Sequence, residues 1–398
     1  MFGRHIAALA CAAVAIAPLA AAAKEPIKIG FPIPLSGPTA TYGVPILQGA
    51  QLAVQQINAK GGVLGRQLEI LPRDSKANAD EAVRLARELI IKNNVEFLAG
   101  TLTSAEAPAV STVAKENKIV FVAPTAKLTE LTEASNLHPY IFRTSSNTAI
   151  EGKAGASIVA RWKGVKRIAT IGPDYAYGRD AIAAFIANIK KLRPDVTIVD
   201  QEWPKLGQNN FTPFITAQMG KKPDAIYCAL FAGDFINFVK QAVPLGYFTA
   251  IKNRLADGAE VGTVDEAGAL GGAYPYGIWS DAYDPVIWNG KEPAAHKAYE
   301  TALRAFMKSK YGSGWAIVGY QSIEALAAGI KKAGSTDSAK VAQAMLGLSI
   351  DTPVGKRTYN AKTHETDAPE YWGQMVKAAK YPFAVMKGPE LLPPPATN

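Results

Sequence analysis

The chain has 398 residues, of which 48% are hydrophobic and 19% are charged, a composition that is ordinary for a globular protein. This length predicts about two domains. The formal net charge is +9 at pH 7, but Lys and Arg are spread along the chain and form no run interleaved with aromatic residues, so the charge does not indicate nucleic-acid binding.

The N-terminus has the pattern of an export signal. Arg4 supplies a positive charge, residues 6–19 form an Ala-rich apolar stretch, and the small residues 21–23 suit a signal peptidase. An uncleaved anchor is the alternative, but the stretch is short for a membrane span, which needs roughly 20 apolar residues. We therefore predict a signal peptide over residues 1–23, cleaved near Ala23, and a periplasmic protein.

Short apolar strands alternate with amphipathic helices in the first part of the chain, with a loop rich in Gly, Pro, Ser and Thr at residues 36–43. The predicted strands are 27–34, 67–72, 95–99 and 119–123, and the predicted helices are 49–59, one that opens at Asn78 and one that opens at Ser104.

The same alternation restarts after residue 145. The predicted helices are 149–162, 180–191, 211–219 and 234–242, the strands between them are 167–171, 196–202 and 225–230, and helices 297–310 and 316–332 precede short strand-like pieces from Ser349 onward. Strands that alternate with helices at this spacing imply parallel sheets covered by helices on both faces. We therefore expect an α/β fold with two doubly wound lobes of similar build.

Motifs for catalysis are missing. The sequence contains no G-x-S-x-G, no P-loop and no G-x-G-x-x-G, and His138, His296 and His364 lack the spacing of metal ligands. We expect a protein that is not an enzyme and that uses no cofactor and no metal.

Candidate binding residues follow predicted strands, because ligands in open α/β sheets lie beyond the carboxyl ends of the strands. Thr103 and Ser104 come after the strand 95–99 and start a helix, where N–H groups and hydroxyls together suit a carboxylate. Plain capping of the helix is the alternative.

A second segment follows the strand 119–123. Thr125, Ala126 and Lys127 offer backbone groups, a hydroxyl and a cation near the same place. A surface position for Lys127 is the alternative, since lone lysines are mostly exposed.

Further candidates lie at the strand ends of the second lobe and in loops. Tyr177 would cover an apolar ligand face, and Asp257 would accept hydrogen bonds from a ligand donor, although both also suit ordinary turns. Tyr42, Phe231 and Trp315 are aromatic candidates that serve equally well in a core.

In combination, these segments resemble the periplasmic Leu/Ile/Val-binding protein family, the type I solute-binding proteins of branched-chain amino acid ABC importers. The likeness covers nearly the whole chain after the signal. The segments that carry it are 29–38 with Tyr42-Gly43, 49–53, 57–62, 64–66, 100–108, 123–124, 177–178 and 283–285.

The resemblance implies two lobes joined by three crossover segments, with the ligand enclosed between them and a monomer that docks on permease subunits in the inner membrane. It places lobe 1 at residues 24–145 and 280–350, and lobe 2 at residues 146–279 and 351–398. A ligand-sensing module that acts through a membrane receptor would share this fold and is the alternative function.

The resemblance also implies roles for single residues. Two departures leave the ligand open between a branched-chain amino acid and an aromatic or aliphatic acid, because Lys127 stands where amino-acid binders commonly have a threonine near the ammonium and Phe231 stands where a tyrosine is common. The implied roles are carboxylate binding for Thr103 and Ser104, backbone contacts for Thr125 and Ala126, covering aromatics for Tyr42, Tyr177 and Trp315, and ammonium binding for Asp257.

Overall fold

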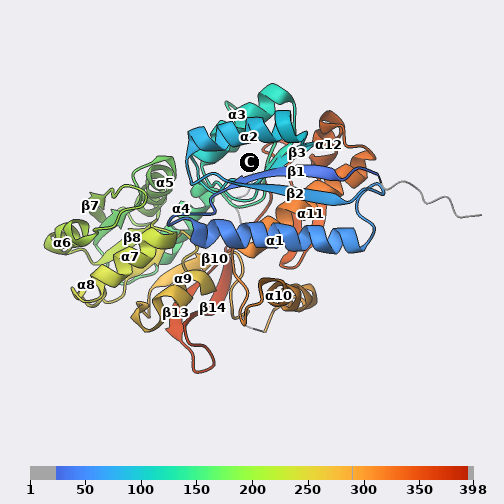
Figure 1. The fold of residues 1–398 in the computed structure, drawn as a ribbon. Coiled ribbons are helices and arrows are strands. Elements are labelled where there is room, and N and C mark those ends of the chain that lie inside the picture. The colour runs from blue at the N-terminus through green and yellow to red at the C-terminus, as the bar shows by residue number, and fades with distance from the viewer. Residues whose placement is uncertain (1–23, 289, 393–398) are drawn as a thin grey trace, which may run out of the picture.

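The computed structural model describes residues 24–288 and 290–392, which form two α/β lobes side by side (Figure 1). The first lobe is built on a five-stranded sheet in the order β2-β1-β3-β4-β5, and every neighbouring pair is parallel. Its strands are β1 Ile27–Ile33, β2 Leu68–Asp74, β3 Phe97–Ala99, β4 Phe121–Ala123 and β5 Ile141–Arg143.

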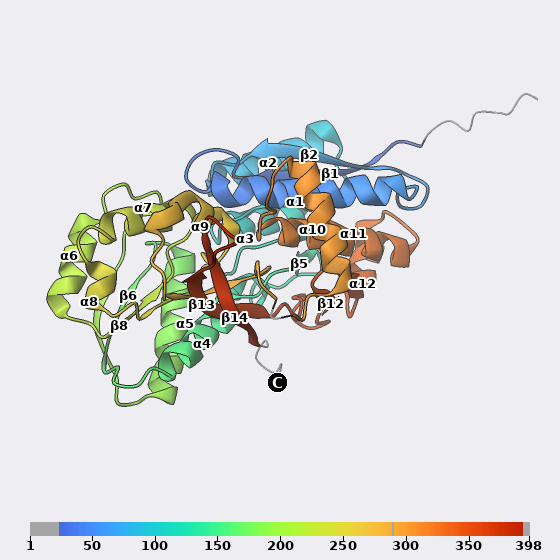
Figure 2. The ribbon, with the colours of Figure 1, turned by 90° about the horizontal axis from the view of Figure 1, so that it is seen from below.

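The second lobe is built on a seven-stranded sheet in the order β14-β13-β10-β9-β8-β6-β7. The strands from β6 to β10 are parallel to one another. The strand β13 is antiparallel to both of its neighbours, β10 and β14, and β14 closes one edge of the sheet beside the helix α9 (Val264–Leu270; Figure 2). The strands are β6 Arg167–Ile171, β7 Thr197–Glu202, β8 Ala225–Cys228, β9 Leu255–Asp257, β10 Trp279–Ala282, β13 Glu370–Lys377 and β14 Ala384–Leu392.

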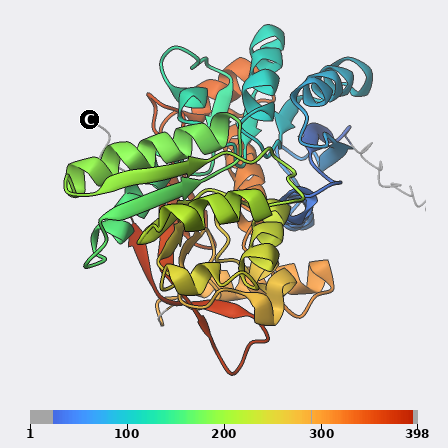
Figure 3. The ribbon, with the colours of Figure 1, turned by 90° about the vertical axis from the view of Figure 1, so that its left-hand side faces the viewer.

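Helices cover both faces of each sheet, as the strand–helix alternation predicts (Figures 1 and 3). In the first lobe they are α1 Ala40–Ala59, α2 Ala79–Asn93, α3 Glu106–Asn117, η1 Thr129–Thr132, α10 Ala294–Met307, α11 Ala316–Ala333 and α12 Ser338–Met345. In the second lobe they are α4 Thr148–Ala160, α5 Ala176–Leu192, α6 Thr212–Lys221, α7 Ala232–Ala242, α8 Tyr247–Ala250, α9 Val264–Leu270 and η2 Gly271–Ala273.

The helices α1 and α5 begin well before their predicted starts. The sequence predicts a loop over residues 36–43, but α1 begins at Ala40 and packs closely against α11 farther along, at Gly49. A Cβ at Gly49 would lie only 1.8 Å from the carbonyl oxygen of Ala316 in α11. Likewise α5 begins at Ala176, so Tyr177 lies in a helix rather than in a turn.

The chain passes between the sheets three times, which confirms the predicted fold class. The first passage leads from β5 to α4, the second from β10 to α10, and the third from the hairpin β11 Ser349–Thr352 and β12 Gly355–Thr358 to β13. Arg143 at the end of β5 forms an ion pair with Glu365, which ties the first passage to the third. The exact lobe boundaries stay a prediction, although residues 279–282 belong to the second sheet and the hairpin contacts α11.

The predicted signal peptide lies outside the described residues. Within the described part of the chain, no helix combines the length and the apolar character that crossing a membrane requires.

Candidate ligand-binding site

A pocket with an empty volume of about 340 Å³ lies between the two lobes. Most of its lining follows the carboxyl ends of parallel strands of both sheets, the edge at which α/β proteins bind ligands. Residues from the first lobe are Tyr42, Leu102, Ser104, Thr125, Ala126, Lys127 and Trp315; residues from the second lobe and the passage after β10 are Tyr175, Tyr177, Phe231, Ala259, Glu260 and Tyr283.

The structure brings together all of the predicted site residues except Thr103 and Asp257, which do not line the pocket. The residues that line it come from segments far apart in the chain: Tyr42, Ser104, Thr125, Ala126, Lys127, Tyr177, Phe231 and Trp315.

Thr103 acts in a capping arrangement. Its hydroxyl donates to Oε2 of Glu106 at 2.8 Å, its N–H donates to the same oxygen at 2.9 Å, and the Glu106 N–H donates back to Thr103 Oγ1 at 3.2 Å. This reciprocal pattern satisfies the start of α3. The hydroxyl and the N–H of Thr103 are thus already engaged, and its role in carboxylate binding stays a prediction.

Ser104, in contrast, keeps a donor for a ligand. Its Oγ accepts a hydrogen bond from the Leu128 N–H at 3.1 Å, and a hydroxyl that accepts still has its own hydrogen to donate. The neighbouring hydroxyl of Thr125 donates to the carbonyl of Leu102 at 2.9 Å, so it holds the two loops together. Ser104 thus keeps a hydroxyl hydrogen in the wall of the pocket.

Asp257 supports the loop that contains Glu260. It is buried at the end of β9, and its Oδ1 accepts the Ala259 N–H at 2.8 Å in an Asx-type turn. Burial raises the pKa of Asp257 to about 8. The turn carries Glu260 into the pocket, a residue that the sequence analysis missed; its signal was a second acid, three positions after Asp257, in the same loop.

Aromatic rings from both lobes form the apolar wall of the pocket. Tyr42 stacks on Trp315 with ring centroids 3.9 Å apart, and Tyr42 also lies 5.9 Å from Phe231 of the other lobe. The ring of Tyr177 meets Phe231 edge-on at 5.6 Å. Such a wall suits a flat or branched apolar group, because large rings bury much area and lose little conformational freedom.

Backbone strain gathers beside the same pocket. Ala126 and Glu260 both line it and have left-handed φ angles of 70° and 57°. Non-glycine residues in this region cost roughly 1–3 kcal/mol and persist where the surroundings hold them, often at functional sites.

Lys127 points inward and its side chain meets a cluster of acids. Its Nζ lies 3.0 Å from Glu151 Oε2, 3.1 Å from Glu370 Oε1 and 4.0 Å from Asp281 Oδ2, and it forms a further ion pair with Glu260. Only 5% of Lys127 is exposed, so the alternative of a surface lysine is wrong. We call these four carboxylates, of Glu151, Glu260, Asp281 and Glu370, the acidic cluster.

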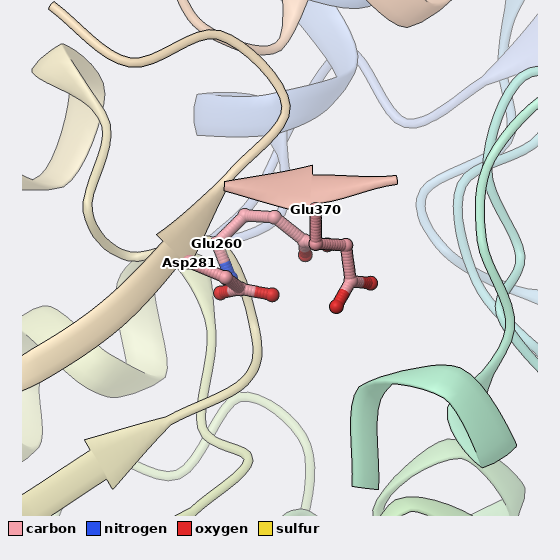
Figure 4. A group of neighbouring side chains, drawn as sticks. All are labelled: Glu260, Asp281 and Glu370. Atoms are coloured by element: carbon pink, nitrogen blue, oxygen red, sulfur yellow. The ribbon is translucent and has the colours of Figure 1, made fainter. Parts of the chain in front are cut away.

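The acidic cluster has the composition of a cation site. Single oxygens of Glu260, Asp281 and Glu370 lie within 4.8 Å of one another, and their side chains approach from separate segments (Figure 4). The ammonium of Lys127 supplies a cation there. Burial opposes the charge on Lys127, but Glu151, Glu260 and Glu370 outweigh that effect and hold its pKa well above the usual value.

Because it buries carboxyl groups, the folded protein is expected to become less stable as the pH rises. Burial raises the pKa of Glu260 to about 7, so the folded protein holds a proton that the unfolded chain releases near pH 4.5. The contribution of this proton to the free energy of unfolding is complete below pH 4.5 and is lost as the pH rises through 7. The free energy of unfolding therefore falls by about 2 kcal/mol between pH 5 and 8. Urea unfolding at both pH values measures it, and Glu260→Gln should reduce the pH dependence; an unchanged dependence in the variant would show that Glu260 does not titrate in this range.

Comparison with known proteins shows the family. The model of the periplasmic binding protein family matches residues 26–380, and the chain belongs to this family, as the sequence resemblance predicts. A Leu/Ile/Val-binding protein of Rhizobium johnstonii is 31% identical over 89% of this chain and 92% of its own. A leucine-, isoleucine-, valine-, threonine- and alanine-binding protein of Pseudomonas aeruginosa is 28% identical over 90% of this chain and 91% of its own.

Solved structures share the fold. A solute-binding protein of an ABC transporter from Rhodopseudomonas palustris, in complex with 3,4-dihydroxybenzoic acid, has a TM-score of 0.82 at 24% identity and covers 92% of this chain and 98% of its own. A branched-chain amino acid transporter substrate-binding protein from Streptococcus pneumoniae, in complex with isoleucine, has a TM-score of 0.79 at 24% identity and covers 93% of this chain and 100% of its own.

Proposed function

We propose that the protein is the periplasmic solute-binding subunit of an ABC importer, which encloses a small carboxylate between its lobes and delivers it to permease subunits. The observation that carries this proposal is the pocket between the lobes, which joins the Ser104 hydroxyl to a wall of aromatic rings. A few convergent polar groups in an apolar pocket are typical of small-molecule sites. The names of the relatives support a binding role over catalysis. That the protein works as a monomer stays a prediction from the sequence resemblance.

The pocket offers hydrogen-bond donors that fit a hydrogen-bond acceptor on the ligand. Ser104 offers a hydroxyl hydrogen, and the buried Nε1–H of Trp315 has no partner within the described residues. A buried donor without a partner costs free energy, which a ligand oxygen would recover. A carboxylate or a phenol oxygen on an apolar body matches this combination.

A thermal-shift screen tests the function. The purified protein, refolded to remove any bound solute, is heated with benzoate-type acids, cinnamate-type acids, short aliphatic acids, amino acids, amides and sugars. A ligand that binds only the folded state raises the melting temperature as its concentration exceeds Kd. A shift with at least one carboxylate is expected; shifts with sugars alone, or with none of these compounds, would overturn the proposal.

Ser104→Ala is expected to weaken carboxylate binding by about 10- to 100-fold, because a hydrogen bond to a charged group contributes about 1.5–3 kcal/mol. Calorimetric titration with the best acid of the screen measures the change. Ser157→Ala is the matched control, since Ser157 donates to the Ala154 carbonyl in α4, outside the pocket lining. Equal affinities in the two variants would remove Ser104 from the site.

A further inference from the structure

The acids around Lys127 all belong to the second lobe, whereas Lys127 belongs to the first. Glu151 lies in α4, Asp281 in β10 and Glu370 in β13, and Glu260 follows β9. Lys127 follows β4 of the other sheet. The ion pairs of Lys127 therefore cross from one lobe to the other, directly beside the ligand pocket that Lys127 and Glu260 both line.

The ammonium of Lys127 has no hydrogen left for a ligand. An ammonium carries three N–H donors, and three carboxylates, those of Glu151, Glu260 and Glu370, form ion pairs with it at hydrogen-bonding range. In addition, the centroid of the Tyr283 ring lies 5.5 Å from Nζ, so this ring covers the ammonium on another side. Lys127 is thus not a receptor for the ligand carboxylate, although it is a cation in the pocket wall.

The same contacts leave the acids unavailable to a second cation. A ligand ammonium that reached Glu260 would lie beside the buried ammonium of Lys127, and like charges at short range in a buried site repel strongly. A ligand without an ammonium meets no such repulsion.

We propose that Lys127 is a built-in ammonium, which fills the acidic cluster from within the protein and thereby selects ligands that carry a carboxylate but no ammonium. This inference rests on the proposed function and names its substrate class: aromatic or aliphatic monocarboxylic acids rather than α-amino acids. Lys127 is then the specificity-determining residue of the pocket. Because its ion pairs cross the lobes, it also takes over a link between the lobes that a ligand ammonium would otherwise provide.

Matched ligand pairs test the inference. The pairs 4-methylpentanoate with leucine, and 3-phenylpropanoate with phenylalanine, differ only in the ammonium. Calorimetric titration of the wild-type protein is expected to show the acid of at least one pair binding at least about tenfold more tightly than its amino acid. In Lys127→Thr this preference is expected to shrink or invert, because the amino acid supplies the missing ammonium to the acidic cluster.

Two further variants complete the experiment. Lys153→Thr, on the exposed side of α4, is the control and should keep the wild-type preference. If Lys127→Thr does not fold, Lys127→Thr/Glu151→Gln removes one acid together with the cation and keeps Glu260 for the ligand. Equal binding of acid and amino acid by the wild type in both pairs, or a preference unchanged in both Lys127 variants, would overturn the inference while the proposed function stands. No binding of any acid or amino acid to the wild type would overturn both.

Discussion

Lys127→Met is expected to lower the free energy of unfolding by about 3–5 kcal/mol at pH 8. Removing one partner of a buried ion pair leaves an uncompensated buried charge, and this costs about that much. In this protein the substitution affects more than a single ion pair, because four buried acidic side chains surround the one ammonium.

The pH dependence of this loss identifies its cause. At pH 5 the carboxyl of Glu260, with a pKa of about 7, is protonated, so the missing cation matters less and the loss in Lys127→Met should fall to less than half. Urea unfolding of both proteins at the two pH values measures it. Lys153→Met, an exposed position of α4, should stay within about 0.5 kcal/mol of the wild type. An equal loss at pH 5 and pH 8 would attribute the effect to packing rather than to charge.

Gly233→Val is expected to weaken ligand binding by about 5- to 150-fold, because it opposes the approach of the lobes. Gly233 in α7 faces the loop before α1, and a Cβ there would lie 2.8 Å from the Cβ of Pro38. Overpacking of this kind costs about 1–3 kcal/mol. The cost falls only on the closed arrangement, and a less populated binding form lowers the apparent affinity in proportion.

Titration of both proteins with one ligand measures this change, and small-angle scattering reports whether the variant stays more open. Gly220→Val is the matched control, because no other atom lies within 4 Å of the place where its Cβ would be and Gly220 is exposed in α6. The melting temperature of each ligand-free variant should show that the lobes themselves still fold. Unchanged affinity in Gly233→Val would mean that closure does not require this contact.

Strand–helix alternation predicts most of the fold because each element shows its own local signal. Asn78 is an example: its side chain accepts the Glu81 N–H at 2.9 Å, so the residue that opens the predicted helix also caps α2. The start of α1 has no such signal, since Thr39 at its N-cap makes no side-chain hydrogen bond, and the close packing of α1 on α11 at Gly49 joins distant parts of the chain. Local propensity cannot report a contact between residues that are far apart in the chain.

Only part of the candidate site can be predicted from the sequence. The rule that ligands lie at strand ends selects Ser104, Thr125 and Phe231, because the strand itself is visible in the sequence. The acidic cluster is not predictable, since Glu151, Asp281 and Glu370 come from three elements whose meeting depends on the passages between the lobes. The sequence selects the loop of Asp257, but the acid of that loop that lines the pocket is Glu260, and ligand binding by Asp257 stays a prediction.

Calorimetric titration of the wild-type protein with the acid that gives the largest thermal shift tests the central claim, that the pocket encloses one small carboxylate between the lobes. We expect one molecule bound per chain and a negative heat-capacity change, the mark of an apolar body buried against Tyr42, Phe231 and Trp315. Absence of saturable binding by any carboxylate would contradict this claim. Binding to the wild type without a heat-capacity change, together with an undiminished affinity in Trp315→Ala, would also contradict it.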